Sequence, residues 1–430
     1  MADSALSSQR LHDVPDQLTT ADGIPLKRKL AISMRRARWR AFLMTAPLVV
    51  FMLVSFVLPI GQMLTRSVHN DSFSKALPNF SQALRNWDQK ASSDGLPDEA
   101  LFKLLAEDMA VAREERTIGR AATRINYDHS GTRSLFMGAA RKAKKFEEPY
   151  KETFLELKPK WSDVEMWAAM KRVASDTTTG FYLAAVDRTY DADNNVVEQD
   201  EVRQIYVKLF WRTLYLSAVI TILCFFLAYP IAYLLSVLPL AKSNLLMILV
   251  LLPFWTSLLV RTTAWIALLQ TQGIVNDVMV WLGIIGDDGR VQMIYNQMGT
   301  IIAMTHILLP FMVLPLYSVM KTIPPSYMRA ARSLGANQFT AFVKVYFPQT
   351  IPGIAAGTLL VFILAIGYYI TPALVGGQDG QLISNIIAFH MQKSLNWSLA
   401  AALGSILLAG VLILYWLYNK LIGIDNLKFG

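Results

Sequence analysis

The most regular feature of the chain is a series of six long apolar runs separated by more polar segments. A helix needs about 20 mostly apolar residues to cross a lipid bilayer. Runs of that length occupy residues 41–65, 212–236, 244–270, 299–320, 353–373 and 398–420, and none of them contains Asp or Glu. The pattern therefore predicts an all-α polytopic membrane protein with six transmembrane helices.

The charged residues are concentrated between the first two apolar runs. Of the 73 Lys, Arg, Asp and Glu side chains, 45 lie in residues 66–208, whereas residues 209–430 hold only 16. A water-soluble surface usually has about a quarter of its residues charged, so the second half cannot be covered by water on all sides. Apolar residues recur at helical spacing in 98–116, and Ser162 with Glu165 has capping-box spacing. We expect 66–208 to form a mostly helical inserted domain that serves as a cap or docking surface rather than a catalytic site.

Basic residues predict the orientation of the spans. The short loops that carry Lys and Arg are expected on the cytoplasmic side, and such residues lie in the tail 1–40, between spans two and three, between spans four and five, and after span six. This distribution predicts a cytoplasmic tail at 1–40, a first span at 41–65, an extracytoplasmic insert at 66–208, a membrane core at 209–420 and a cytoplasmic tail at 421–430.

Several kinds of chemistry are excluded by composition. The single cysteine, Cys224, allows no internal disulfide and no cysteine-based metal cluster. No G-x-x-x-x-G-K-[ST] loop is present, so the chain has no P-loop for ATP. The formal charge of +9 is not accompanied by a basic patch interleaved with aromatic residues outside the membrane flanks. We therefore expect no metal, no catalytic residue and no nucleic acid partner.

The segment between spans four and five has the most specific pattern. In residues 324–353, apolar side chains fall at i, i+3, i+4 and i+7 twice, once before Gly335 and once after it. This spacing predicts two short amphipathic helices hinged at Gly335. Pro348 and Pro352 are expected to stop the second helix before span five. The pattern alone fits either an ordinary interfacial helix pair or a surface for a partner protein.

This segment resembles the E-A-A-x3-G-x9-I-x-L-P signature of permease subunits from binding-protein-dependent ABC importers. Arg329-Ala330-Ala331, Gly335, Val345 and Phe347-Pro348 match it with unchanged spacing, although Arg329 stands where the family usually has Glu. The resemblance implies that a loop at 322–350 docks on a cytoplasmic ATPase. The docking residues expected on this basis are Tyr327, Arg329, Ala330, Ala331, Leu334, Gly335, Phe339, Phe342 and Pro348.

Further segments look like the spermidine/putrescine permease group, among them L-L-P-F-W-T-S-L-L-V-R-T-T-A-W at 251–265 and Y-Y-I-T-P-A-L-V-G-G at 368–377. This resemblance covers about 210–415 and the first span. It implies a multi-pass subunit of a bacterial inner membrane that works with a second permease, two ATPases and a periplasmic solute-binding protein. ATP and Mg would be bound by the partner ATPase, and the chain itself would be a transport subunit, not an enzyme.

A path for a polycation would be expected to show carboxylates or aromatic faces in the membrane. The spans have no carboxylates, so aromatic and polar residues are the candidates, although aromatic side chains also collect at membrane interfaces. Prolines 230, 253, 310 and 315 are expected to interrupt spans two to four, and Gly353 with Gly357 predicts a close helix contact, with the partner permease as one candidate. The candidate path comprises Trp255, Thr256, Ser257, Arg261, Trp265, His306, Tyr368 and Tyr369.

Other functions stay open at this point. The same importer architecture could carry an opine, an amino acid or a phosphonate. From a different class, an ion-coupled secondary transporter or a membrane sensor could share the apolar pattern. Ion coupling usually needs carboxylates in the membrane, and a sensor would not need the docking loop.

Overall fold

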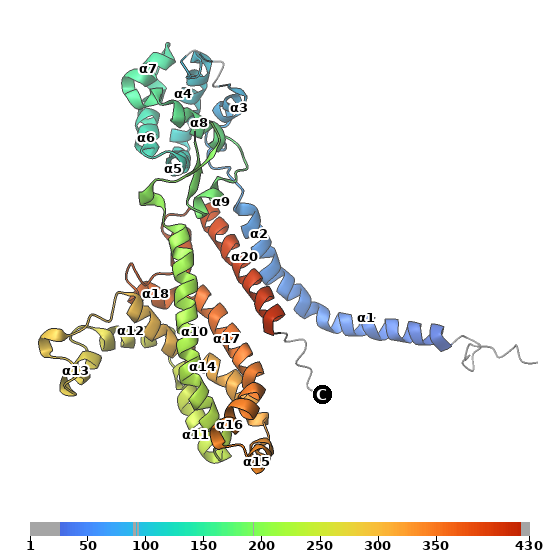
Figure 1. Cartoon of the computed structure of the whole chain (residues 1–430). Coiled ribbons are helices and arrows are strands. Elements are labelled where there is room, and N and C mark those ends of the chain that lie inside the picture. The colour runs from blue at the N-terminus through green and yellow to red at the C-terminus, as the bar shows by residue number, and fades with distance from the viewer. Residues whose placement is uncertain (1–25, 89–91, 93, 192, 423–430) are drawn as a thin grey trace, which may run out of the picture. The chain divides into compact units, whose positions relative to one another are not determined.

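A computed structural model describes residues 26–88, 92, 94–191 and 193–422 of the protein (Figure 1). Most of the predicted N-terminal tail and nearly all of the predicted C-terminal tail lie outside the described residues. The chain divides into two compact units at Met63 and Leu64. Each unit is described by itself.

The first unit contains the N-terminal helix. It consists of α1 (Leu26–Met52), a π-helical turn (Leu53–Val57) and the beginning of α2 (Leu58–Arg66). The stretch Ser33–Arg66 is long and apolar enough to cross a membrane. It includes the whole of the predicted span 41–65, which is therefore confirmed as a helix.

The second unit begins with the inserted domain, which is mostly helical as predicted. Its α-helices are α3 (Pro78–Asn86), α4 (Glu99–Glu114), α5 (Ile118–Asp128), α6 (Thr132–Lys142), α7 (Tyr150–Leu157), α8 (Val164–Val173) and α9 (Gly180–Ala185). A short antiparallel hairpin follows, in which β1 (Arg188–Tyr190) pairs with β2 (Val196–Glu198) and Thr189 lies opposite Val197.

The predicted capping box at Ser162 is wrong. The side chain of Asp163 caps α8 instead, because its Oδ1 accepts hydrogen bonds from the backbone N–H groups of Glu165 and Met166 at 3.0 and 3.3 Å. Ser162 Oγ donates to the carbonyl of Pro159 and is not available to the helix. Asp and Ser are both strong N-cap residues. The prediction therefore placed the N-cap at Ser162, one residue before the actual N-cap, Asp163.

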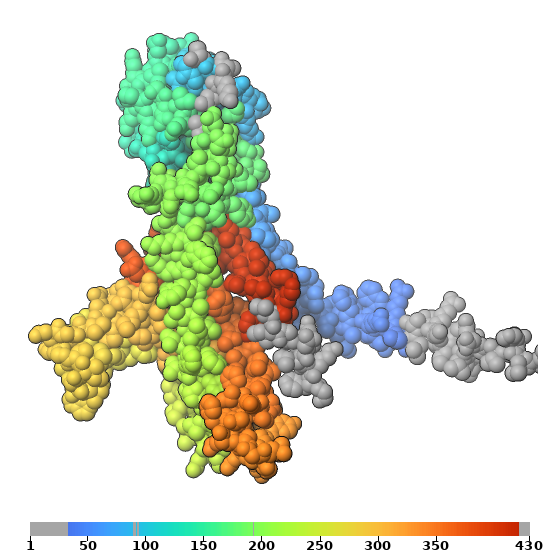
Figure 2. Space-filling model, in the orientation of Figure 1, coloured from blue at the N-terminus to red at the C-terminus, as the bar shows by residue number. Residues whose placement is uncertain are grey.

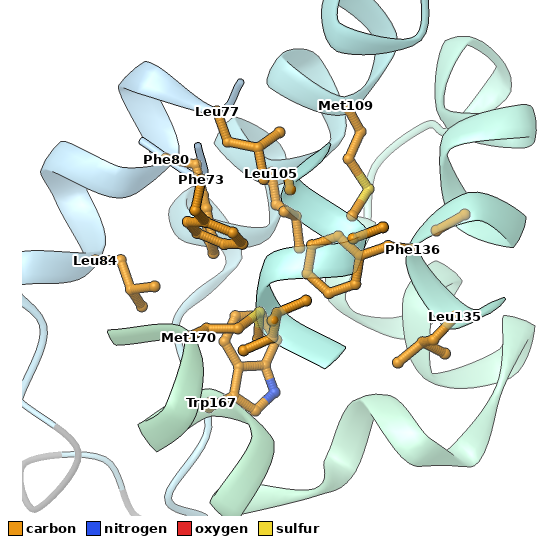
Figure 3. Close-up of a cluster of buried hydrophobic side chains, with 14 of the residues drawn as sticks. Phe73, Leu77, Phe80, Leu84, Leu105, Met109, Leu135, Phe136, Trp167 and Met170 are labelled. Atoms are coloured by element: carbon orange, nitrogen blue, oxygen red, sulfur yellow. The ribbon is translucent and has the colours of Figure 1, made fainter. Parts of the chain in front are cut away.

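Helices α3 to α8 enclose a core of large apolar side chains (Figure 3). Trp167 is fully buried at its centre, with the ring centroid of Phe102 at 4.9 Å and that of Phe80 at 6.2 Å. The indole N–H of Trp167 donates to the carbonyl of Trp161 at 2.8 Å, so burial leaves this polar group satisfied. The insert therefore has a complete hydrophobic core of its own.

The membrane region is built on three long helices that pack together. They are α10 (Tyr206–Val237), α14 (Gln297–Thr322) and α17 (Phe347–Gly367). Around them lie α11 (Leu240–Leu251), α12 (Leu258–Leu269), α13 (Ile274–Trp281), α15 (Pro325–Ser333), α16 (Gln338–Ala341), α18 (Ile370–Val375), α19 (Ile383–Gln392) and α20 (Trp397–Ile422).

The interruption predicted at Pro253 in the third span is confirmed, and the span is a bent pair of helices. The helical pair Leu240–Trp255 and Leu258–Trp281 bends by 96° at the break between them. Pro253 lies in the 3₁₀ turn Leu252–Trp255, where it lacks an N–H for continued helical bonding, and Thr256 is extended. Among the described residues, five helices are long and apolar enough to span a membrane, and the bent pair brings the number to six if it counts as one span.

The interruptions predicted at the other three prolines are wrong. Pro230 lies inside the continuous helix α10, and Pro310 and Pro315 lie inside α14. Prolines are tolerated in membrane helices because neighbouring helices and local adjustments re-satisfy the freed backbone groups.

The glycine pair of span five contacts this chain rather than a partner. A Cβ atom on Gly353 would lie 3.1 Å from the carbonyl oxygen of Pro315, and one on Gly357 would lie 2.7 Å from Sδ of Met312. Both contacts are with α14. The two glycines thus bring α17 and α14 close together inside the bundle.

Candidate docking loop and translocation path

The predicted loop helices form on either side of Gly335. Helix α15 ends at Ser333, and Gly335 has a positive φ of 89°. Asn337 then starts α16, because its Oδ1 accepts a hydrogen bond from the backbone N–H of Thr340 at 2.7 Å. The left-handed conformation at Gly335 is one that glycine adopts without steric cost, so the hinge predicted from the sequence is present.

Most of the predicted docking residues are exposed at one end of the bundle (Figures 1 and 2). Leu334 is 89% exposed and Phe339 is 76% exposed, whereas apolar side chains of this size are usually buried. The remaining exposed positions are Tyr327, Arg329, Ala330, Gly335 and Pro348, and Ala331 is half-buried. An exposed apolar surface rimmed by polar residues is typical of a protein interaction site.

Phe342 differs from the other predicted docking residues, because it faces the interior of the bundle. Its ring centroid lies 5.8 Å from that of Tyr233 and 6.3 Å from that of Tyr229, both on α10. Tyr346, one turn further along, lies 5.4 Å from Tyr233 and is buried. Phe342 and Tyr346 therefore anchor the loop to α10, beneath the exposed surface.

The expected stop at Pro348 and Pro352 is wrong. Residues Gln338–Gly367 form one long helical stretch in which the π-helical turn Phe342–Tyr346 joins α16 to α17. The π turn changes the hydrogen-bond register just before Pro348, which takes an early position in α17 where a missing N–H is tolerated. The loop is consequently continuous with span five.

Three of the predicted path residues of span three, Trp255, Thr256 and Ser257, lie at its break. Trp255 is 86% exposed and Thr256 and Ser257 connect the two halves of the bent pair. Arg261, one turn into α12, donates from Nη2 to the carbonyl of Thr256 at 3.2 Å. Its Nε is buried and has no hydrogen-bond partner among the described residues. The guanidinium therefore binds the backbone at the break through Nη2, and its Nε is left without an acceptor.

Trp265 and His306 form a second group. The indole N–H of Trp265 donates to Nδ1 of His306 at 3.1 Å, and the ring centroids are 5.3 Å apart in an edge-to-face arrangement. Because an indole nitrogen only donates, Nδ1 must be the acceptor and the imidazole is in its neutral form. Both residues border a cavity of about 350 Å³ whose other lining residues are Leu223, Leu227, Ile301, Ile302, Thr305 and Leu309.

Tyr368 and Tyr369 lie at a different place, between α17 and α18. Their backbone carbonyls accept hydrogen bonds from Ser384 Oγ at 2.6 Å and from Asn385 Nδ2 at 2.7 Å. Among the described residues, no ring contact joins either tyrosine to Trp255 or Trp265. The predicted path residues thus form separate groups rather than one aromatic cage.

Thr305 was missed by the sequence reasoning. Its Oγ1 is buried and has no hydrogen-bond partner among the described residues, and Thr305 borders the same cavity as His306. An unsatisfied buried hydroxyl is costly, so Thr305 stands out from the apolar residues that border this cavity. The signal in the sequence was its position next to His306, the single histidine of the apolar run 299–320.

Residues 215–422 match the family model described as binding-protein-dependent transport system inner membrane component. The spermidine/putrescine transport system permease protein PotB of Haemophilus influenzae is 35% identical over 221 residues, which cover 51% of this chain and 77% of the relative. PotB of Escherichia coli is 34% identical and is covered over 80% of its length. A solved bacterial ABC transporter involved in the import of alginate is 19% identical, covers 54% of this chain and 81% of that chain, and superposes with a TM-score of 0.43.

The multi-pass helical core and the exposed loop define a permease subunit, a membrane transport component rather than an enzyme. The chain belongs to the family of inner membrane components of binding-protein-dependent transport systems. The insert at 66–208 precedes the region that the family model matches.

Proposed function

We propose that this permease moves a polyamine such as putrescine or spermidine into the cytoplasm by alternating access. A cytoplasmic ATPase, present in two copies and holding ATP and Mg, docks on the loop 322–350. A second permease subunit completes the pathway, and a periplasmic solute-binding protein delivers the cargo. In this arrangement the N and C termini are cytoplasmic and the insert is extracytoplasmic.

The observation that carries the proposal is the exposed apolar surface of α15 and α16, anchored beneath by Phe342 and Tyr346. Arg329 is exposed and takes part in none of the ion pairs found among the described residues. The docking surface would therefore be mainly apolar and steric, with Leu334 and Phe339 at its centre. Closure of the ATPases would push on α16 and shift α17 against α10 and α14.

The cargo assignment is supported by the 35% and 34% identity to spermidine/putrescine permeases. The six apolar runs contain no carboxylate, so the groups that could receive a cation there are neutral polar groups and π faces. The neutral imidazole of His306 adds no positive charge beside Trp265. A cation can bind the face of an indole ring without a carboxylate partner.

Docking is tested by co-purifying the full chain with its ATPase and measuring ATP-dependent uptake. Leu334→Asp should abolish both, because it places a charge at an 89% exposed apolar position without disturbing any buried contact. Gly335→Asp should do the same, since a Cβ at this position has open space around it and only the backbone conformation is strained. Val111→Asp, at a 54% exposed position of α4, is the matched control and should retain both. Uptake that persists without an ATPase would contradict the importer mechanism.

The cargo is tested by competition. Uptake of labelled putrescine by the assembled transporter should be reduced by unlabelled spermidine and unaffected by an opine, an amino acid or a phosphonate. Competition by one of the latter three, without competition by spermidine, would reject the polyamine assignment while leaving the docking proposal intact.

A further inference from the structure

A cavity of about 370 Å³ lies where the insert meets the first turns of α10 and α20. It is bordered by Tyr127 at the end of α5, Arg172 at the end of α8, Arg188 on β1, Arg203, Tyr206 at the start of α10, and Asn396 just before α20. The cavity is separate from the docking loop and from the cavity beside His306. Neither the proposed transport cycle nor the family resemblance uses it.

The charged residues that border this cavity are three arginines, Arg172, Arg188 and Arg203, and one aspartate, Asp128. No carboxylate of the described residues lies within 4.0 Å of the guanidinium nitrogens of Arg172, Arg188 or Arg203. Two of these side chains are directed by backbone carbonyls, with Arg172 Nη1 donating to Asp191 at 2.8 Å and Arg203 Nη1 donating to Tyr127 at 3.3 Å. Both bonds use one donor of a group that has five, so the arginines are positioned and still have free N–H groups.

The nearby carboxylates are already engaged. Asp128, which borders the cavity, pairs with Arg124 at 2.9 Å. Asp191 accepts hydrogen bonds from the backbone N–H and the side-chain amide of Asn195 at 2.8 and 3.1 Å. Asp187 is only 8% exposed, and it caps α10 by accepting from the N–H groups of Ile205, Tyr206 and Val207 at 2.8–3.1 Å. The three arginines therefore form no ion pair among the described residues, and Asp128 and Asp191 act on Arg172 only from a longer distance.

Asn396 supplies an unused donor at the same cavity. Its Oδ1 accepts a hydrogen bond from the backbone N–H of Leu399 at 3.2 Å, which fixes the orientation of the amide at the start of α20. Asn396 is 9% exposed, and its Nδ2 is buried with no partner among the described residues. A buried donor without an acceptor is destabilising, and an acceptor carried by a bound ligand would satisfy it.

We propose that this cavity binds the phosphate group of a small anionic ligand. Guanidinium groups match phosphate oxygens in a forked, charge-assisted geometry, and the Nδ2 of Asn396 adds a neutral donor. Three arginines against the single aspartate on the cavity wall disfavour a polyamine, so the site is distinct from any cargo site. Because α10 and α20 begin here, the phosphate can come from the headgroup of an anionic phospholipid or from a free phosphate ester in water.

The site is tested with the full-length chain in two arms. In detergent, inorganic phosphate is titrated against chloride at equal ionic strength and the thermal unfolding midpoint is followed. In nanodiscs, native mass spectrometry compares retention of phosphatidylglycerol with retention of phosphatidylcholine. A midpoint that rises with phosphate indicates a free phosphate ligand, and selective retention of phosphatidylglycerol indicates a lipid headgroup. Either result supports the site when the variants below abolish it.

Two variants remove different donors. Asn396→Asp keeps the oxygen that caps α20 and replaces the free amide with an anionic oxygen, so the apparent Kd should increase by about tenfold or more. Arg188→Gln removes an exposed guanidinium that makes no ion pair among the described residues and should have a similar effect. Arg141→Gln, on the exposed face of α6, makes the same charge change outside the cavity and should bind as the unmodified chain does. The proposal is overturned if neither probe binds, if both variants bind normally, or if the Arg141 variant weakens binding equally.

Discussion

In the insert, helices α3 to α8 surround fully buried Trp161, Trp167, Phe80 and Phe102, and buried charged side chains such as Asp108 and Arg124 are hydrogen-bonded. In the membrane region the arrangement is different. Large apolar side chains such as Trp211, Phe226 and Trp416 are 60–69% exposed, while threonines 213, 262, 300 and 371 are almost completely buried. The insert is stabilised by burying apolar side chains away from water. The membrane region is surrounded by hydrocarbon, so its interior is specified by close packing and by polar contacts between helices.

This difference predicts the largest mutational effect in the insert. Trp167→Ala should lower the free energy of unfolding of the insert by about 3–5 kcal/mol, because it leaves a cavity among Phe80, Phe102 and Trp161. Hydrogen exchange of α4 and α8 in the full-length chain measures the loss of protection. Val111→Ala, at an exposed position on α4, should change it by no more than about 0.5 kcal/mol. Unchanged protection in the Trp167 variant would mean that the core is not a cooperative unit.

The same difference explains what could be predicted from the sequence. Apolar runs identify membrane helices because the bilayer imposes a length of about 20 residues, so five of the six runs correspond to long helices. The sequence could not show that the helix breaks at Pro253 and continues through Pro230, Pro310 and Pro315. Whether a proline breaks a membrane helix depends on the helices around it, which the local sequence does not contain.

The local structure around Gly335 was predicted more accurately than the arrangement of the candidate path residues. Its amphipathic spacing and Gly335 are local signals, and the structure places a hinge at this glycine. The role of Phe342 needed the tertiary structure, because its spacing resembles that of Phe339 although only Phe342 meets Tyr233 on α10. The pairing of Trp265 with His306 joins residues 41 positions apart in the chain, and no local pattern predicts it. The cavity bordered by Arg172, Arg188 and Arg203 likewise combines residues that are far apart in the chain.

The junction between the two regions should respond to pH. His390 on α19 is buried outside the membrane spans, and burial lowers its pKa to about 4. Its Nε2 lies 3.0 Å from the hydroxyl oxygen of Tyr206, and its Nδ1 lies 2.8 Å from Ser394 Oγ. The unfolded chain gains a proton on this histidine near pH 6.5, whereas the folded chain gains it only near pH 4. Stability is therefore complete above about pH 6.5 and falls as the pH decreases through this window.

The loss should reach about 3 kcal/mol near pH 4, and thermal unfolding of the full-length chain across this range measures it. His390→Gln should remove this part of the pH dependence, because glutamine does not titrate. His69→Gln, at a half-exposed position, is the control and should keep the decline. A His390 variant with the same pH dependence as the unmodified chain would place the responsible titration elsewhere.

The smallest effect is expected for the loss of a single polar contact between membrane helices. Its size can be compared directly with the loss of apolar packing in the insert. Oγ1 of Thr262 on α12 lies 3.3 Å from Oγ1 of Thr371 on α18, and both residues are fully buried. Interhelical hydrogen bonds of this kind contribute about 0.6 kcal/mol in membrane proteins, with measured values up to about 1.7. Thr262→Val, Thr371→Val and the double variant form a cycle that isolates the contact from the packing of each methyl group. Unfolding in mixed micelles should give a coupling of about 0.6 kcal/mol, well below the loss at Trp167. A coupling as large as the effect of Trp167→Ala would instead mean that hydrogen bonds stabilise the membrane region as strongly as hydrocarbon burial stabilises the insert.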